Sequence, residues 1–149
     1  MKRHFLRLFE YNQWANRLFC ETILNSDYQS KKIEVLLSHT LAAELIWLDR
    51  ISQITIPVPG TWELLPLNKA IESLNAADKL WLSYLMDEPD IDAVIEYSDS
   101  EGKRHQTILK DIIMHVANHG THHRAQLATL LRQENIAPPA SDFIFFARS

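Results

Sequence analysis

Glycine and proline are distributed so unevenly along this chain that long stretches contain almost no residue that breaks a helix. The 149 residues include 3 glycines and 6 prolines, and the prolines gather in short connecting segments. Between these segments, apolar residues recur at the three- and four-residue spacing of one helix face. The pattern predicts four helices, at about residues 4–24, 30–54, 67–85 and 107–133. Thr107 is the expected N-cap of the last helix, and Asp111 is favourably placed in its early turns.

One segment before the last predicted helix departs from this pattern. Val94, Ile95 and Tyr97 favour a strand, and the Asp-Ser-Glu-Gly run that follows favours a turn. A short β-hairpin packed against the helices is predicted here, because an isolated hairpin is marginal in water. We therefore expect one all-α domain, residues 1–149, built as a four-helix bundle with a short β-hairpin before the last helix.

Composition excludes several classes of protein. The formal net charge is −4 and no run of Lys or Arg occurs, which argues against a sequence-independent nucleic-acid binder. No stretch approaches the roughly 20 apolar residues that a membrane span requires, and the first residues lack the apolar region of a signal peptide. The expected location is the cytoplasm. The single cysteine, Cys20, cannot form an intrachain disulfide, and we expect it to be a small buried hydrophobic residue.

Four of the seven histidines lie within the nine residues 115–123. Helical residues four apart lie one turn apart on the same face, so His119 and His123 can grip one metal ion. His39, between apolar residues of the second predicted helix, is the candidate third ligand from a facing helix. Two other interpretations stay open: His39 as a hydrogen-bonded core residue, and the cluster as a solvated polar face. His115 and His122 are neighbours without an assigned role.

Three neutral imidazoles with an open fourth position are typical of a catalytic zinc site, and nickel, iron or copper also accept imidazole. A zinc-protease helix would read His-Glu-x-x-His, but here Gly120 stands where that motif has its general base. A di-iron bundle would need Glu-x-x-His pairs, and the chain has none. A glycine within a helix costs about 1 kcal/mol relative to alanine. Gly120 therefore indicates close approach of another backbone or room beside a ligand, unless it is simply tolerated.

Several motifs resemble the DinB family, also grouped as DinB/YfiT-like metalloenzymes. They are "FEYNQWANRLF" near the start, "LLSHTLAAELIWLDRI" in the second helix, the hairpin with "HVANHGTHHRAQ", and the ending "PPASDFIFFAR". The resemblance covers almost the whole chain. It implies an up-down-down-up four-helix bundle, commonly a homodimer, with nickel or zinc held by His39, His119 and His123. Arg124 and Gln126 match the family's His-His-Arg-Gly-Gln run, whereas Ala125 stands at its glycine.

The resemblance also implies an activity. Some relatives are thiol-dependent S-transferases, and related maleylpyruvate isomerases also need a thiol; the family name records induction by DNA damage. An open metal position would stabilise a cosubstrate thiolate. We expect a metal-dependent transferase or hydrolase acting on a small molecule, with a low-molecular-weight thiol as a candidate cosubstrate and no nucleic-acid or membrane partner. The alternatives are a non-catalytic bundle that is stabilised by metal or senses it, and a metal-free bundle that dimerises.

No general acid or base can be assigned from the sequence. Glu44 and His122 are the nearest candidates, but Glu44 follows His39 by five residues and is turned about 140° around the helix from it. The four tryptophans are expected in the core or lining a pocket. Trp47, two turns after His39, is placed to line the site if it is not packed in the core.

Overall fold

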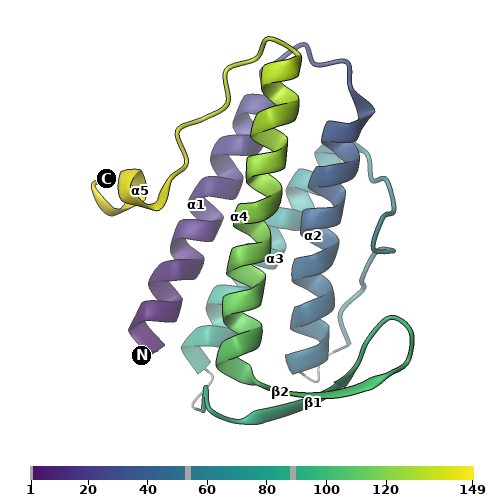
Figure 1. Ribbon diagram of the computed structural model, residues 1–149, viewed down its shortest axis with the longest axis vertical. Coiled ribbons are helices and arrows are strands. Elements are labelled where there is room, and N and C mark those ends of the chain that lie inside the picture. The colour runs from purple at the N-terminus through teal and green to yellow at the C-terminus, as the bar shows by residue number, and fades with distance from the viewer. Residues whose placement is uncertain (1, 53–54, 88–89) are drawn as a thin grey trace.

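Five helices and a two-stranded sheet form the described parts of the computed structural model, residues 2–52, 55–87 and 90–149. In chain order they are α1 (Lys2–Leu24), α2 (Lys31–Ser52), α3 (Leu67–Asp87), β1 (Val94–Ser98), β2 (Arg104–Ile108), α4 (Leu109–Gln133) and α5 (Phe143–Ala147). Figure 1 shows the four long helices side by side, with the hairpin across one end. There α1 and α4 run away from the hairpin end, and α2 and α3 run back toward it. The predicted mostly helical fold is confirmed.

The predicted N-cap of α4 is wrong. Thr107 lies in β2, and the N-cap residue is Ile108, which makes no side-chain capping hydrogen bond. The first N–H groups of the helix are satisfied by the backbone instead, because Leu109 and Lys110 donate to the carbonyls of Ala93 and Ile91 at 2.9 Å each. The strand thus passes directly into the helix. The predicted second helix extended to residue 54, but residues 53 and 54 lie outside the described part of the chain.

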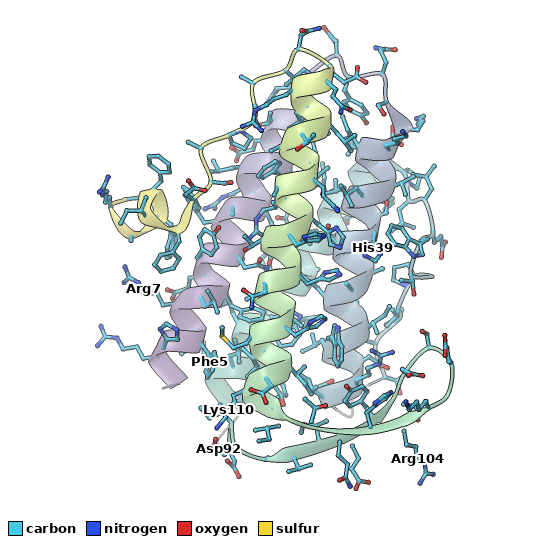
Figure 2. The ribbon with its side chains drawn as sticks, viewed as in Figure 1. Phe5, Arg7, His39, Asp92, Arg104 and Lys110 are labelled. Atoms are coloured by element: carbon cyan, nitrogen blue, oxygen red, sulfur yellow. The ribbon has the colours of Figure 1, made fainter. Side chains whose placement is uncertain are left out.

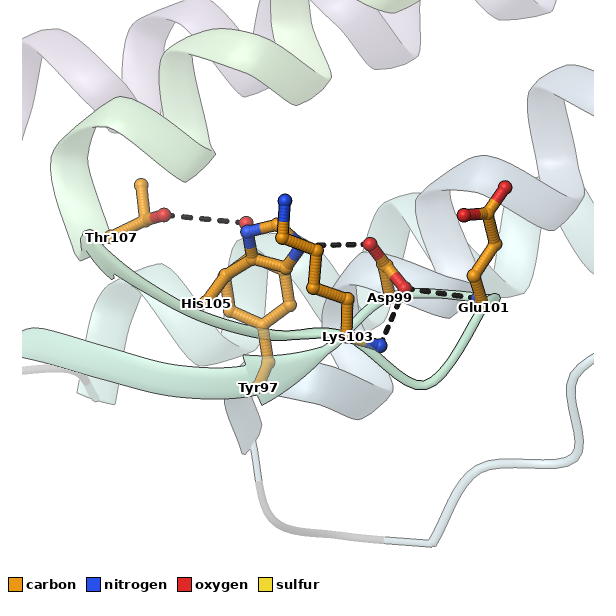
Figure 3. Close-up of polar contacts among 6 residues, drawn as sticks. All are labelled: Tyr97, Asp99, Glu101, Lys103, His105 and Thr107. Atoms are coloured by element: carbon orange, nitrogen blue, oxygen red, sulfur yellow. Dashed lines mark hydrogen bonds and ion pairs between the residues drawn. The ribbon is translucent and has the colours of Figure 1, made fainter.

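The hairpin is confirmed, with antiparallel strands in which Tyr97 pairs with His105. Asp99 organises its turn by accepting hydrogen bonds from the backbone N–H groups of Glu101 and Lys103, at 2.9 and 3.0 Å (Figure 3). The other carboxylate oxygen of Asp99 lies 2.7 Å from Nε2 of His105. These contacts all lie within the hairpin itself.

Aromatic and cationic side chains fix the hairpin on α2. The Trp47 ring meets the Tyr97 ring edge-on at 5.1 Å between centroids, and the Arg50 guanidinium lies over both rings. Trp47 also lies 5.2 Å from the His115 ring of α4. The hairpin therefore packs against two helices at the end of the molecule, as predicted.

Buried apolar side chains form two separate clusters. One lies toward the hairpin and includes Phe5, Phe9, Leu48, Trp81 and Ile112; the other lies toward the opposite end and includes Phe19, Cys20, Leu37, Leu74 and Leu131. Cys20 is 4% exposed, as predicted, and burial together with nearby carboxylates raises its pKa to about 12. Between the two clusters all four long helices carry buried polar residues, and there the candidate site lies.

The short helix α5 was not predicted from the sequence. It packs on α1 through the Phe143 and Phe146 rings, whose centroids lie 5.2 and 5.8 Å from the Tyr11 ring. The Tyr11 hydroxyl donates to the Ser141 carbonyl at 3.0 Å and holds the chain that leads into this helix. No helix among the described residues combines the length and the apolar character needed to cross a membrane.

Candidate metal centre

Three histidines converge between α2 and α4. His39 comes from α2, and His119 and His123 come from successive turns of α4. One ring nitrogen from each lies within 4.8 Å of the others, so the group is able to hold a metal ion. Figure 2 shows the His39 side chain in the space between the two helices. The structure thus brings together the three residues that were the candidate ligands.

Hydrogen bonds on the outer side of two rings determine which nitrogen is free. Nδ1 of His39 lies 2.8 Å from the carbonyl oxygen of Thr61. Nδ1 of His123 lies 2.7 Å from Oε1 of Gln126. Because these oxygens only accept, each Nδ1 carries the hydrogen and each Nε2 presents a lone pair. Both rings therefore offer Nε2 to a common centre.

The spacing of the α4 pair suits a small cation. Nε2 of His119 and Nε2 of His123 lie 3.0 Å apart. Two nitrogens bound to one tetrahedral zinc ion, each at about 2.0–2.1 Å, stand about 3.3 Å apart. Without a cation, two such lone pairs repel unless one nitrogen is protonated. The donor set and its spacing therefore fit a divalent ion that accepts imidazole.

The environment favours the neutral form of the two α4 imidazoles, His119 and His123. Burial lowers the pKa of His119 to about 4, with a further contribution from the neighbouring histidines. Burial also lowers the pKa of His123, although the Gln126 hydrogen bond acts in the opposite direction. Only a neutral imidazole binds a metal, so both rings are ready to do so at neutral pH.

An exposed tryptophan covers one face of the site. The Trp62 ring stacks on the His39 ring, with 3.7 Å between centroids and 5° between planes, yet Trp62 is 62% exposed. The four tryptophans consequently have different roles: Trp81 is fully buried in the core, whereas Trp47 contacts His115 and the hairpin. Trp62 contacts a candidate ligand directly, whereas the sequence had offered Trp47 as the tryptophan that would line the site if it were not packed in the core.

The other two histidines of the cluster lie outside the three-histidine group. His115 faces Trp47, and its ring is 5.6 Å from that of His119. His122 is exposed, and its Nε2 lies 3.1 Å from Nε2 of Gln126, which donates to it. His122 thus contributes to orienting Gln126, the residue that orients His123.

Gly120 lies where another helix approaches α4 closely. A Cβ atom at this position would lie 2.6 Å from Oδ1 of Asn12 and 3.0 Å from Nη1 of Arg124. Real Cβ atoms essentially never come as close as 2.6 Å to another atom, and 3.0 Å is tighter than nine in ten real Cβ contacts. The predicted close approach is confirmed, but the approaching group is a side chain and not a backbone.

Asn12 belongs to a buried polar cluster that joins all four long helices, which we call the polar layer; its members are Asn12, Asn16, Glu44, Asp78 and Arg124. Nη1 of Arg124 donates to the side-chain oxygens of Asn12 and Asn16 at 2.7 and 2.8 Å. The two asparagine amides in turn donate to Oε1 of Glu44 at 2.9 and 3.2 Å. Glu44, a candidate acid or base from the sequence, therefore bonds to α1 in this layer and is directed away from the site.

The polar layer holds two carboxyl groups and one guanidinium. Nδ2 of Asn16 donates to Oδ1 of Asp78 at 3.3 Å. Within the described part of the chain, Oδ2 of Asp78 and Oε2 of Glu44 are buried without a hydrogen-bond partner. Burial, followed by repulsion from Glu44, raises the pKa of Asp78 to about 9. Burial also raises the pKa of Glu44. Burial thus favours the protonated form of both carboxyl groups, and the nearby Arg124 guanidinium acts in the opposite direction on both.

Comparison with known proteins identifies the family of this chain. The model of the DinB family matches residues 1–149. Protein DinB of Bacillus subtilis (strain 168) is 24% identical over 154 residues, an alignment that covers 92% of this chain and 90% of that protein. The family match therefore spans both the helix with the paired histidines and the helix with His39. On this evidence the chain belongs to the DinB family.

Proposed function

We propose that the protein is a metal-dependent enzyme in which His39, His119 and His123 hold one divalent cation. Zinc and nickel suit the site best, because three neutral imidazoles are favoured ligands for both; iron and copper are also compatible. The observation that carries the proposal is the tautomer of two rings, since Thr61 and Gln126 fix His39 and His123 with Nε2 free. Such outer hydrogen bonds are typical of histidines that bind metals.

An open coordination position distinguishes this proposal from a purely structural metal site. Structural zinc sites are normally closed by four protein ligands. Among the described residues, the group that could hold a metal has three members, with no fourth His, Cys, Asp or Glu. This favours an enzyme over the alternative of a non-catalytic bundle that is stabilised by metal or senses it.

The proposed reaction is a thiol-dependent S-transfer or a hydrolysis of a small molecule. A bound divalent ion would supply a Lewis acid that lowers the pKa of a thiol or water. The chain's own Cys20 is unsuited as nucleophile, because it is buried and burial raises its pKa to about 12. A low-molecular-weight thiol would therefore have to enter from outside. In this proposal the metal ion is bound by His39, His119 and His123. Thr61 orients the His39 ring, Gln126 orients the His123 ring, and Trp62 shields one face of the site.

The same proposal extends to the architecture and the assembly. The four long helices of Figure 1 follow the up-down-down-up order expected of a single four-helix-bundle domain, residues 1–149. We place the protein in the cytoplasm as a damage-inducible homodimer, without nucleic-acid or membrane partners. Phe143, Ile144 and Phe145 of α5 are 42–49% exposed and supply an apolar surface for a second copy. Sedimentation analysis would reveal a monomer if this assignment is wrong.

Metal content tests the proposed site. Protein purified without a His-tag should carry about one equivalent of metal per chain, and His39→Ala and His119→Ala should lose it. His115→Ala is the matched control, because it removes a histidine of the same helix that lies outside the group. Equal metal content in all four proteins would exclude the site.

A further inference from the structure

A surface groove begins beside the histidine site and runs between α2 and α4. Its volume is about 430 Å³. Its apolar walls are formed by Val35, Leu36, Trp62 and Leu130. Leu36 and Leu130 also pack against the core, which makes these two walls fixed parts of the fold.

The groove is continuous with the site through two of its lining residues. Trp62 stacks on the His39 ring at 3.7 Å, and Gln126 accepts the Nδ1 hydrogen of His123 at 2.7 Å. From this end the groove follows α2 toward Lys32, seven residues before His39. At 1.5 Å per residue, those positions lie about 10 Å apart along the helix.

Most polar groups that line the groove already have partners. Gln126 accepts from His123 and donates to His122, and the Thr129 hydroxyl donates to the Ala125 carbonyl at 3.1 Å. The groove therefore offers a bound molecule chiefly apolar contacts.

Lys32 is the exception, because it is the one charged side chain that lines the groove. Its neighbour Lys31 pairs with Glu34 at 2.7 Å. Within the described ranges 2–52, 55–87 and 90–149, no ion pair involves Lys32. The groove thus combines an apolar floor with a single available cation at its far end.

We infer that this groove binds the apolar body of an organic anion, with an alkyl or aryl chain about 10 Å long and its carboxylate at Lys32. The inference rests on the proposed function only in naming this anion as the substrate of the adjacent metal site. The apolar walls select the chain, and Lys32 selects the charged end. A second copy of the protein is the competing occupant of such a surface.

Titration calorimetry with straight-chain carboxylates from butanoate to octanoate tests the inference on full-length, metal-free protein. Affinity should rise about twofold for each added methylene. A fully buried methylene would raise it about fourfold, but the groove is open on one side, so about half of that free energy is expected. Octanol should bind more weakly than octanoate. Failure of octanoate to bind, or an affinity independent of chain length, would overturn the inference.

Three variants connect the binding to this groove. Lys32→Ala should reduce the affinity for octanoate to that for octanol, whereas Lys31→Ala, one residue away, should leave it unchanged. Trp62→Ala should weaken both ligands, and circular dichroism should confirm an intact fold because Trp62 is exposed. Octanoate affinities equal to wild type in Lys32→Ala and Trp62→Ala would place the binding elsewhere and refute the inference.

The same experiments distinguish carboxylate binding from a second copy of the protein in the groove, and they are independent of the proposed metal site. If a second copy fills the groove, octanoate affinity should fall as protein concentration rises, and Trp62→Ala should shift the protein toward monomer. Either observation would count against the inference. The carboxylate titrations use metal-free protein, so octanoate binding stands even if the histidines bind no metal. If the protein binds neither octanoate nor metal, the first result rejects the groove inference and the second rejects the proposed metal site.

Discussion

The two sides of α4 carry polar clusters of opposite character at the same level of the molecule. Toward α2, His119 and His123 present neutral nitrogens to a shared centre. Toward α1, Gly120 leaves room for the Asn12 side chain, and Arg124 donates hydrogen bonds to Asn12 and Asn16 in the buried polar layer. The polar layer thus contains its own positive charge, whereas the histidine group has acceptors but no cation.

Within six residues of α4, one cluster therefore stabilises the fold and the other is able to bind a metal ion. The polar layer joins all four long helices and fixes the position of α4, because its hydrogen bonds connect Arg124 to Asn12 and Asn16 and these to Glu44 and Asp78. The histidine group makes few bonds toward its own centre, and Thr61 and Gln126 hold two of its rings from outside. Changes in the layer should therefore affect stability first, and changes around the histidines should affect metal binding first.

The largest expected effect follows from removing the cation of the polar layer. Arg124→Met leaves the buried side-chain oxygens of Asn12 and Asn16 without their charged donor and removes the cation near Glu44, so the free energy of unfolding should fall by about 3–5 kcal/mol. Urea unfolding monitored by circular dichroism measures it. Arg132→Met, an exposed arginine on the same helix, should change stability by no more than about 0.5 kcal/mol. If both substitutions changed the free energy of unfolding equally, the polar layer would not be important for stability.

A smaller effect is expected from disturbing the support of the histidine group. Gln126→Leu removes the acceptor that holds His123, and metal affinity should fall about 10–100-fold. Competition with a chromophoric chelator measures the affinity. Gln126→Glu keeps an acceptor and should retain most of it, and Gln133→Leu on the exposed end of α4 serves as control. A large fall in the free energy of unfolding of the metal-free Gln126→Leu protein would contradict the division between the two clusters.

The protonated carboxyl of the polar layer predicts a pH dependence of stability. The pKa of Asp78 is raised from 3.8 to about 9 in the folded protein. The unfolded chain therefore loses this proton first, and stability should fall as pH rises from about 4 to about 9, by at most about 1.4 kcal/mol per pH unit. Asp78→Asn should flatten this slope in metal-free protein. An identical slope in wild type and variant would show that Asp78 is ionised in the fold.

The smallest expected effect concerns the close contact between Gly120 of α4 and the Asn12 side chain of the polar layer. Alanine in place of a helix glycine normally stabilises by about 1 kcal/mol, but Gly120→Ala would force Asn12 aside at a cost of about 1–3 kcal/mol. We expect a net loss of about 1 kcal/mol in thermal or urea unfolding. In an Asn12→Ala background the same substitution should become stabilising. A gain in stability in the otherwise unchanged protein would show that the contact is unimportant.

Local patterns predicted the helices and the paired histidines well. Breaker-free segments and apolar spacing located the long helices, and the four-residue spacing of His119 and His123 follows from helix geometry. His39 required more, because nothing local connects α2 to α4; the expected packing of facing helices made it a candidate, and the resemblance to the DinB family implied the same residue. The structure agrees in bringing the three rings together.

Features that depend on tertiary contacts were not predictable from the sequence. Thr107 looks like an N-cap, but pairing of the hairpin draws it into β2. Trp62 looks like a core residue, but the path of its loop across α2 places it on His39. Glu44 and Asp78 resemble ordinary helix-surface acids, and only the packing of four helices shows that both are buried. Sequence patterns report local geometry, and these residues depend on partners far along the chain.

The most direct test of the account is nitrogen-15 NMR of the histidine side chains, without metal and with one equivalent of zinc. Long-range proton–nitrogen correlations distinguish Nδ1 from Nε2 in each ring. The account predicts that His39 and His123 keep their hydrogen on Nδ1 in both states, and that zinc shifts Nε2 of His39, His119 and His123. Zinc-induced shifts at Nδ1 of His39 or His123, or at His115 and His122 instead of the three, would contradict it.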